Sequence, residues 1–374
     1  MRPHLPNRLD AMIAANRSFA IYRIPGSKTL RLLSQEKGEV SLLHTIEDLN
    51  GQSGFVIAPF AVSPSCPIAL LHPEAVEVMP APEGEEPVSG AGKPKPQAGV
   101  GEAYPSRFQS FITPIQEKRF QKLVLSRALT LKREDGFSPG EAFLLACRQY
   151  THSYVYLFHT PATGAWLGCT PEILLSGEDK RWTTVALAGT QALRQGGLPD
   201  SWDDKNLIEQ RLVSYYIRSQ LASFDIRPEE NGPYAIRAGA LAHLRTDFHF
   251  TLPEAGRLGD LLRLLHPSPA VSGLPKEEAF RFILANEGYD RRYYAGFIGW
   301  LEPGGKSDLY VNLRCMNIQA QTFTLYAGGG LLPSSRLADE WQETEDKLQT
   351  ILFIINNQKN SQSCIQVKKA YSSL

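Results

Sequence analysis

Three charged side chains recur at helical spacing near the C-terminus of the chain. In the segment 337–355, Glu340, Glu343 and Lys347 stand at positions i, i+3 and i+7, so they share one face of the expected helix. Two carboxylates one turn apart repel each other unless a cation lies between them, and Mg²⁺ prefers carboxylate oxygens. This face is therefore a candidate magnesium site. The alternative is a solvated helix face with one Glu343–Lys347 ion pair.

A further carboxylate lies in the helix that is expected over about residues 203–224. Glu209 shares a stripe with Val213 and Tyr216, at the edge of an otherwise apolar face. If it is buried, it needs a cation or a metal as a partner. The alternative is a boundary glutamate that reaches solvent. Ser201 is the expected N-cap of this helix.

Two residues in the strand-rich middle of the chain are candidates for a base and an acid. Lys122 alternates with Val124 and Ser126 along an apolar strand, so its ammonium group is expected to point into the fold, where desolvation lowers the proton affinity of a lysine. An edge lysine that blocks aggregation is the alternative. Glu172 follows Pro171 and precedes a run of apolar residues. That setting raises the pKa of a carboxyl group and allows it to donate a proton near neutral pH.

The remaining candidates are weaker when each is taken alone. Arg314 lies among apolar strand residues, which is typical of an arginine that binds a carboxylate through two hydrogen bonds. The triple glycine Gly328–Gly330 offers backbone N–H groups to an anion, although it has neither the phosphate-loop nor the GxGxxG spacing. His243 and His266 are candidate site histidines, and a buried structural role is the alternative for both.

The composition is that of an ordinary globular protein without net charge. The 374 residues include 39 Lys and Arg and 39 Asp and Glu, so no overall field attracts the chain to nucleic acid or to an anionic membrane. The five cysteines follow no disulfide or zinc pattern, which favours a reducing compartment. No stretch approaches the roughly 18 apolar residues of a membrane span. We therefore expect a soluble, cytoplasmic protein with no nucleic-acid or membrane partner.

The order of elements predicts an α+β layered fold with long helices and antiparallel strands. Within 297–330, three strands, one of them over 307–318, are predicted to form an antiparallel meander. Four regions are expected: a strand-rich N-terminal lobe of the same fold (1–80), a Pro/Gly-rich linker or mobile loop (81–104), the region that carries the chemistry (105–356) and a polar, frayed C-terminal tail (357–374).

Taken together and in order, these segments resemble the chorismate-utilising (chorismate-binding) enzymes, and among them the isochorismate synthases. The likeness rests on KLVLSR, TPEILL, LAGT, KNLIEQRLV, LLHPSPAVSG, EGYDRRYYAGFIGW, LRC, YAGGGLLP and EWQETEDKL. These segments span roughly two thirds of the chain, and the first 80 residues carry no such signature. The resemblance implies a fold with two central antiparallel β-sheets and helices packed outside, an active site between the sheets, and a requirement for Mg²⁺.

The resemblance also implies a role for each candidate residue. Lys122 matches the general base and Glu172 the general acid. The magnesium ligands would be Glu209, Glu340 and Glu343. The groups that bind substrate would be Thr190, His243, Arg314, Lys347 and the backbone of Gly328, Gly329 and Gly330.

Two positions depart from the family pattern. Asn206 stands where members often have an aspartate, three residues before the first magnesium glutamate, and Gln342 replaces an arginine. The asparagine at position 206 puts in doubt whether this residue supports the metal indirectly. It does not replace any of the expected magnesium ligands.

The implied reaction is the Mg²⁺-dependent addition of water to C2 of chorismate with loss of the C4 hydroxyl group. Ammonia-using relatives are disfavoured, because aminodeoxychorismate synthases carry a nucleophilic lysine where this chain has Ala188, and anthranilate synthases usually have glutamine in place of Lys122. Salicylate synthases, which go on to eliminate pyruvate, tend to have threonine where this chain has Val271. They are the closest alternative, and a non-catalytic chorismate-binding protein is another. We expect a monomer without a glutamine amidotransferase subunit, acting in menaquinone biosynthesis or, as the second choice, in siderophore biosynthesis.

Overall fold

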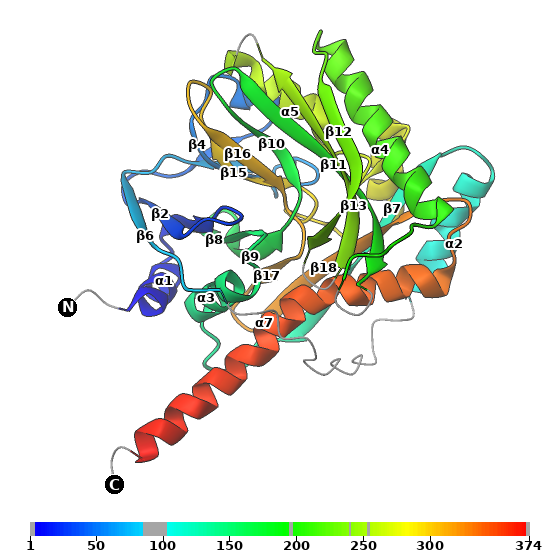
Figure 1. The fold of residues 1–374 in the computed structure, drawn as a ribbon. Coiled ribbons are helices and arrows are strands. Elements are labelled where there is room, and N and C mark those ends of the chain that lie inside the picture. The colour runs from blue at the N-terminus through cyan, green and yellow to red at the C-terminus, as the bar shows by residue number, and fades with distance from the viewer. Residues whose placement is uncertain (1–3, 85–102, 194–196, 239–240, 253–254, 372–374) are drawn as a thin grey trace.

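Two nine-stranded antiparallel β-sheets form the centre of the molecule in the computed structural model, which describes residues 4–84, 103–193, 197–238, 241–252 and 255–371 (Figure 1). In spatial order, sheet A contains β14 (Gly273–Leu274), β7 (Lys122–Lys132), β18 (Thr322–Leu331), β17 (Cys315–Ile318), β9 (Gly164–Thr170), β8 (Tyr154–Thr160), β1 (Ser18–Arg23), β2 (Thr29–Gln35) and β6 (Ala75–Pro80). Sheet B contains β12 (Glu229–Ala238), β13 (Leu241–Thr251), β11 (Arg181–Ala192), β10 (Ile173–Glu178), β16 (Ser307–Val311), β15 (Phe297–Leu301), β4 (Gly54–Ala58), β5 (Ile68–Leu71) and β3 (Ser41–Leu43).

The N-terminal 80 residues belong to both sheets. They supply β1, β2 and β6 to sheet A and β3, β4 and β5 to sheet B. They also form a helix that the sequence reading did not anticipate, α1 (Leu5–Ala14), which has a proline in its first turn and buries Leu9 and Met12. Most of the linker expected over 81–104 lies outside the described residues, and the next helix begins at Ala103.

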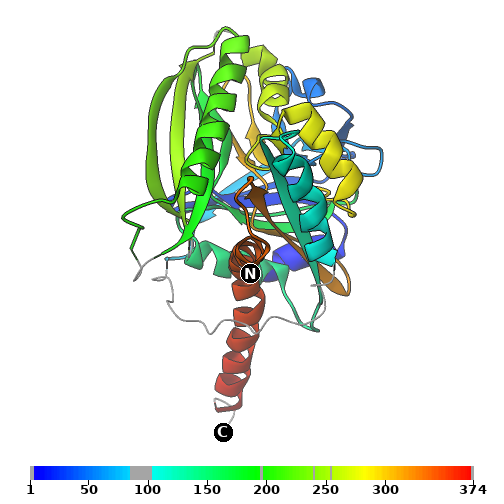
Figure 2. The ribbon, with the colours of Figure 1, turned by 90° about the vertical axis from the view of Figure 1, so that its right-hand side faces the viewer.

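Helices cover the outer faces of the two sheets, as Figures 1 and 2 show. The helix α4 (Asp204–Ser223) packs on β11 and β13, while α2 (Ala103–Gln116) and α6 (Lys276–Asn286) pack on β7. The other helices are α3 (Pro139–Gln149), α5 (Leu258–Leu265) and α7 (Leu337–Tyr371), of which α3 and α7 pack on sheet A. The expected α+β fold with two central sheets and external helices is confirmed.

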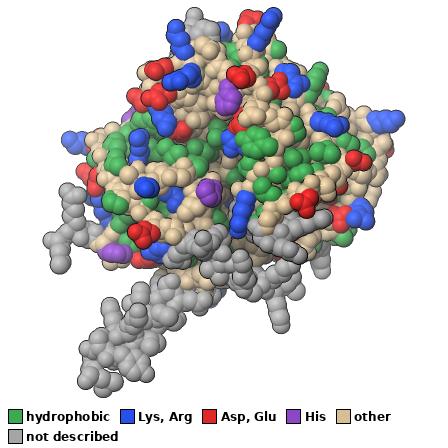
Figure 3. Space-filling view, viewed as in Figure 1, with side chains coloured by type: hydrophobic (Ala, Val, Ile, Leu, Met, Phe, Trp, Pro, Cys, Tyr) green, Lys and Arg blue, Asp and Glu red, His purple; other side chains and the backbone are tan. Residues whose placement is uncertain are grey.

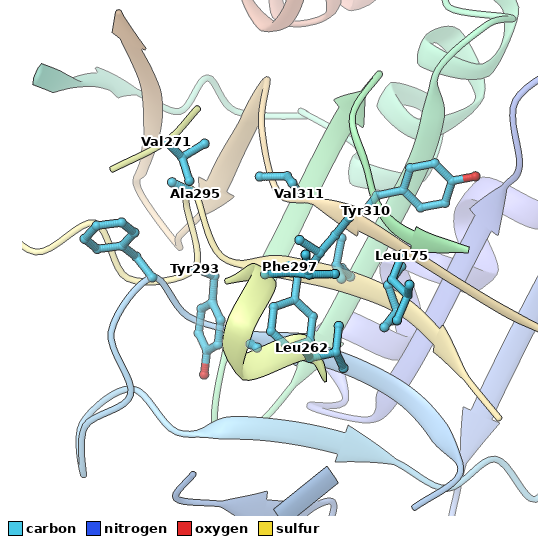
Figure 4. Packing of buried hydrophobic residues seen from close by; sticks show 14 of the residues in the cluster. Leu175, Leu262, Val271, Tyr293, Ala295, Phe297, Tyr310 and Val311 are labelled. Carbon is cyan, nitrogen blue, oxygen red and sulfur yellow. The ribbon is translucent and has the colours of Figure 1, made fainter. Parts of the chain in front are cut away.

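The main hydrophobic core lies between the sheets. Aromatic pairs join them: Tyr154 of β8 stacks on Tyr310 of β16 at a centroid distance of 4.2 Å, and Phe55 of β4 lies 5.5 Å from Phe158 of β8. Figure 4 shows part of this core, with Val271 beside Ala295 at its margin. The loop that carries Val271 is therefore anchored by packing.

The strand expected over 307–318 is split, so that part of the predicted meander is wrong. The segment forms β16 in sheet B and β17 in sheet A, and the chain crosses between the sheets at residues 312–314. Asn312 fixes the crossing: its side-chain amide donates to the Tyr293 carbonyl at 2.8 Å and accepts from the Tyr156 hydroxyl at 2.6 Å. Arg314 has φ +47° and lies in the break rather than in a strand. Alternation of apolar residues cannot reveal such a change of sheet, because both halves are buried.

Two helix ends also differ from expectation. The N-cap of α4 is Asp203, whose carboxylate accepts from the Asn206 N–H at 2.8 Å, rather than Ser201. The helix α7 continues to Tyr371 and extends away from the body, where a frayed tail was expected (Figure 1). Residues 356–371 contain no proline or glycine to stop it.

Charged side chains of both signs lie on the face shown in Figure 3. On the face in Figure 3, basic and acidic side chains are interspersed, as the balanced composition predicts. Among the helices that the structure describes, none is long and apolar enough to cross a membrane.

Candidate active site

A cavity lies where β7 and β18 of sheet A face β11 and β13 of sheet B, with α4 and α7 closing it. Eight of the twelve predicted site residues line it: Glu172, Thr190, Glu209, His243, Arg314, Gly328, Gly330 and Lys347. It is small, about 60 Å³, so a ring-sized ligand requires its lining side chains to move apart. The other four, Lys122, Gly329, Glu340 and Glu343, lie directly behind this lining, as described below. The tertiary structure thus brings all twelve into one cluster.

Glu172 is held as a neutral acid. It follows β9, its side chain lies in the cavity wall, and only 4% of the residue is exposed. Burial raises the pKa of its carboxyl group to about 8, against a smaller lowering by the nearby charges of Lys122, Lys347 and Arg314. At neutral pH the group therefore carries a proton that it can donate.

Lys122 is fully buried behind Glu209. Its Nζ lies 2.8 Å from Glu209 Oε1, an ion-pair distance, although Nζ makes no hydrogen bond of good geometry. Gly330 permits this approach, because a Cβ there would lie 2.2 Å from Glu209 Oε1 and 2.7 Å from Lys122 Cε. A glycine at this position is thus a steric requirement of the Lys122–Glu209 pair.

Two ammonium groups neutralise the glutamates of α7. Lys205 Nζ lies 2.6 Å from Glu340 Oε1 and 3.8 Å from Glu343 Oε2, and Lys347 Nζ lies 2.6 Å from Glu343 Oε1. Burial and the charge of Glu343 raise the pKa of Glu340 to about 7. For Glu343, the effect of burial is outweighed by Lys347 and Lys205, so its pKa is lowered. Lys347 also donates to the Gly328 carbonyl at 2.8 Å.

The glutamates offer the donor set of a hard divalent cation. Glu340 Oε2 is buried without a hydrogen-bond partner, and a Cβ on Gly329 would come within 3.0 Å of it. As they stand, no three acidic, histidine or cysteine side chains of the described residues are grouped closely enough to ligate one ion. The glutamates are paired with the ammonium groups of Lys122, Lys205 and Lys347 instead. The residues fit Mg²⁺ chemically, provided that Lys205 and Lys122 release the carboxylates.

A second polar group lies across the cavity. Arg314 Nη2 donates to His243 Nε2 at 3.3 Å, and His243 Nδ1 lies 3.2 Å from the Gly189 carbonyl and 3.3 Å from Thr190 Oγ1. Asn206 Oδ1 accepts from the Thr190 N–H at 2.8 Å. The cavity therefore has a guanidinium group and the Lys347 ammonium group on its wall, both suited to a carboxylate ligand.

The two departures from the family pattern have separate explanations. Asn206 joins the start of α4 to β11, because its amide nitrogen also donates to Asp203 Oδ2 at 2.8 Å. An aspartate there would face the Asp203 carboxylate. Gln342 donates to Asp346 at 2.8 Å on the outer side of α7. His266 is buried with its Nε2 3.2 Å from the Pro59 carbonyl, and it does not line the cavity.

Sequence reasoning missed two features of the site. Lys205 lies one helical turn before Glu209, so the i, i+4 relation on α4 was a usable signal. Tyr294 and Tyr326 line the cavity and stack with a centroid distance of 5.3 Å, but no spacing in the sequence relates them.

Comparisons with known proteins identify the family and the fold. A family model described as chorismate binding enzyme matches residues 83–356. Isochorismate synthase EntC of Escherichia coli K12 is 31% identical over 246 residues, which cover 62% of this chain and 62% of EntC. The chain therefore spans less than two thirds of that relative's length.

Two solved structures have the same fold. The putative 2,3-dihydroxybenzoate-specific isochorismate synthase DhbC of Bacillus anthracis superposes with a TM-score of 0.76 at 22% identity, covering 94% of this chain and all of that one. The menaquinone-specific isochorismate synthase MenF of Escherichia coli gives a TM-score of 0.71 at 22% identity, covering 92% of this chain and 90% of that one.

The two-sheet fold brings a buried carboxyl group, a buried lysine and three further glutamates into one cluster, the type of site that the resemblance implies. Because the family model covers well over half of the chain, the protein belongs to the chorismate binding enzyme family.

Proposed function

We propose that this chain is an isochorismate synthase, which adds water to C2 of chorismate and removes the C4 hydroxyl group. The observation that carries the proposal is a carboxyl group with a pKa of about 8, Glu172, in the same buried cluster as a fully buried lysine, Lys122. The similarity to EntC, which is named an isochorismate synthase, supports the same reaction.

The two groups divide the proton transfers between them. Lys122 Nζ takes a proton from the attacking water as the bond from its oxygen to C2 forms. Glu172 gives its proton to the C4 hydroxyl group, which leaves as water while the ring double bonds shift. One water is consumed and one is released, so the reaction is an isomerisation. No ammonia is used, and we therefore propose that no glutamine amidotransferase subunit is needed.

The cationic part of the cavity lining would bind the substrate carboxylate, and the apolar part would contact the ring. Arg314 and Lys347 supply the positive charge for a substrate carboxylate, and the backbone of the Gly328–Gly330 segment lies beside them. Val124 and Leu187 supply apolar surface for the ring. Exclusion of water from this small cavity strengthens each charge–charge interaction in it.

Glu209, Glu340 and Glu343 would hold Mg²⁺, which when bound neutralises the ring carboxylate of chorismate. To ligate it, Glu340 and Glu343 must release Lys205, whose side chain is 21% exposed and so has a route to solvent. Glu209 must likewise release Lys122, which frees the Nζ atom from its carboxylate partner so that it can approach the attacking water.

Product analysis tests the proposal. Purified protein is incubated with chorismate and Mg²⁺, with and without EDTA, and isochorismate, salicylate and pyruvate are resolved by chromatography. Isochorismate without pyruvate, abolished by EDTA, is expected. Salicylate with equimolar pyruvate would identify a salicylate synthase and would mean that Val271 does not block elimination. Binding of chorismate without turnover would identify a non-catalytic binding protein.

The pathway is a separate question. Isochorismate is the product named for both the menaquinone-specific and the 2,3-dihydroxybenzoate-specific relatives. We propose menaquinone biosynthesis, and the test is complementation. The gene should restore menaquinone in a strain that lacks its menaquinone-specific isochorismate synthase, and restoration of siderophore alone would overturn the assignment.

A further inference from the structure

His243 lies between the Arg314 guanidinium group and the backbone of β11. Its Nε2 is 3.3 Å from Arg314 Nη2, and its Nδ1 is 3.2 Å from the Gly189 carbonyl oxygen. The residue is 6% exposed and lines the cavity. Both ring nitrogens are therefore engaged by protein groups, and neither is free to act on a ligand without breaking one of these contacts.

These contacts determine which ring nitrogen carries the proton. A guanidinium group has only donors, so Nε2 must be the acceptor and cannot carry a proton. The proton is then on Nδ1, which donates it to the Gly189 carbonyl. Burial and the charges of Arg314 and Lys347 lower the pKa of His243 to about 3, so the ring is neutral at physiological pH. The carboxylate of Glu209 acts in the opposite direction, but more weakly.

Arg314 needs such a support. It lies where the chain crosses between the sheets, with φ +47°, outside both β16 and β17. Among the described residues, its other side-chain hydrogen bond is a long one of 3.5 Å to Thr350 Oγ1. Its backbone is held separately, because its carbonyl accepts from the Cys169 N–H at 3.0 Å. The backbone is thus anchored, and His243 accepts the shorter of the two side-chain hydrogen bonds that direct the guanidinium group.

We propose that His243 is a positioning residue that acts through Arg314, as a neutral hydrogen-bond acceptor that directs the guanidinium group at a substrate carboxylate, and that it transfers no proton in the reaction. This inference rests on the proposed function, because the carboxylate is that of chorismate. It differs from a role in contacting or protonating the ring, which would make His243 act independently of Arg314. A pre-oriented arginine binds a carboxylate more tightly, because less side-chain freedom is lost on binding.

A double-mutant cycle separates the two roles. The variants are His243→Met, His243→Gln, Arg314→Met and the two double variants, each assayed for kcat and KM with chorismate. His243→Met is expected to raise KM about tenfold, with a smaller change in kcat. His243→Gln should recover most of that loss, because its amide oxygen can accept from the guanidinium group. In the Arg314→Met background, neither change should alter KM more than about twofold.

The pH profile and a binding measurement complete the test. If His243 only positions Arg314, His243→Gln keeps the limbs of the wild-type profile of kcat against pH. Chorismate binding to Glu172→Gln, measured by calorimetry, should weaken when His243→Met is added, and this readout needs no turnover. The inference would be overturned if His243→Met raised KM by the same factor with and without Arg314. It would also be overturned if a limb of the profile of kcat against pH disappeared in His243→Gln. If the unmodified protein neither converts nor binds chorismate, it is the proposed function that fails. Should His243→Met not fold, His243→Leu, which also lacks a hydrogen-bond acceptor, replaces it in the same comparison.

Discussion

Replacement of Glu172 by glutamine tests the central feature of the site, the protonated carboxyl group. Its pKa is about 8, against an ordinary value of 4.5. Using about 1.4 kcal/mol per pKa unit, the net effect of burial and of the nearby charges costs the ionised form about 5 kcal/mol, an order-of-magnitude figure. The ratio of protonated to ionised groups is then about 10 to 1 at pH 7 and about 1 to 10 at pH 9.

The expected result is a loss of both rate and pH dependence. The wild-type kcat should fall by about tenfold per pH unit above pH 8, because the acid is lost. Glu172→Gln should lower kcat by about 10² to 10⁴, and its residual rate should show no such decline on the basic side. Glu178→Gln, an exposed change on the adjacent strand β10, is the matched control and should behave as wild type. Turnover of Glu172→Gln within a few-fold of wild type would refute the assignment.

The same pKa shift predicts a dependence of stability on pH, which is measured by denaturant unfolding in EDTA. The pKa is raised in the folded state, so the stability that Glu172 contributes is fully present below pH 4.5 and is lost as the pH rises through about 8. Glutamine cannot ionise. The unfolding free energy of Glu172→Gln relative to wild type should therefore increase between those limits, by up to about 5 kcal/mol. A difference that does not change with pH would show that the carboxyl group is not held neutral.

Three further changes have expected outcomes. Gly330→Ala should lower the unfolding free energy by about 1–3 kcal/mol in denaturant titrations and should also reduce turnover, because the new Cβ would meet the Glu209 carboxylate. Unchanged stability would contradict the close approach of Glu209 to Gly330. Lys205→Met should raise the Mg²⁺ affinity, measured by calorimetry, about tenfold, because the Lys205 ammonium group no longer competes for the carboxylates of Glu340 and Glu343. A weaker affinity would mean that this lysine supports the metal. Asn206→Asp should destabilise the fold by about 1–3 kcal/mol, because it replaces a donor to Asp203 with a second carboxylate; a stability equal to wild type would show that the contact is dispensable.

Local periodicity was sufficient for the parts of the site that lie within one element. Glu340, Glu343 and Lys347 share a face because the α-helix has 3.6 residues per turn, and Lys347 does contact Glu343. Alternation along β7 was sufficient to predict that the Lys122 side chain points into the fold, where it is fully buried. The α+β class with antiparallel sheets followed from the order of such elements.

Other features depend on residues that are remote in the sequence. Burial by both sheets raises the pKa of Glu172, and the contact between Lys122 of β7 and Glu209 of α4 joins elements on different sheets. The crossing that carries Arg314 exists because residues 307–318 serve two sheets, each of which buries its half. Periodicity reports which side of an element is apolar, but not which element packs against it.

The sequence by itself therefore determined the residue types, their order and the face of each element on which they lie, because these follow from backbone geometry over a few residues. The tertiary structure alone decided that Lys205 lies at the α7 glutamates and that the His243 ring lies against Arg314. Both depend on how α4, β13 and the crossing before β17 approach one another. Such an approach is a balance of packing and desolvation over the whole chain, and no local pattern encodes it.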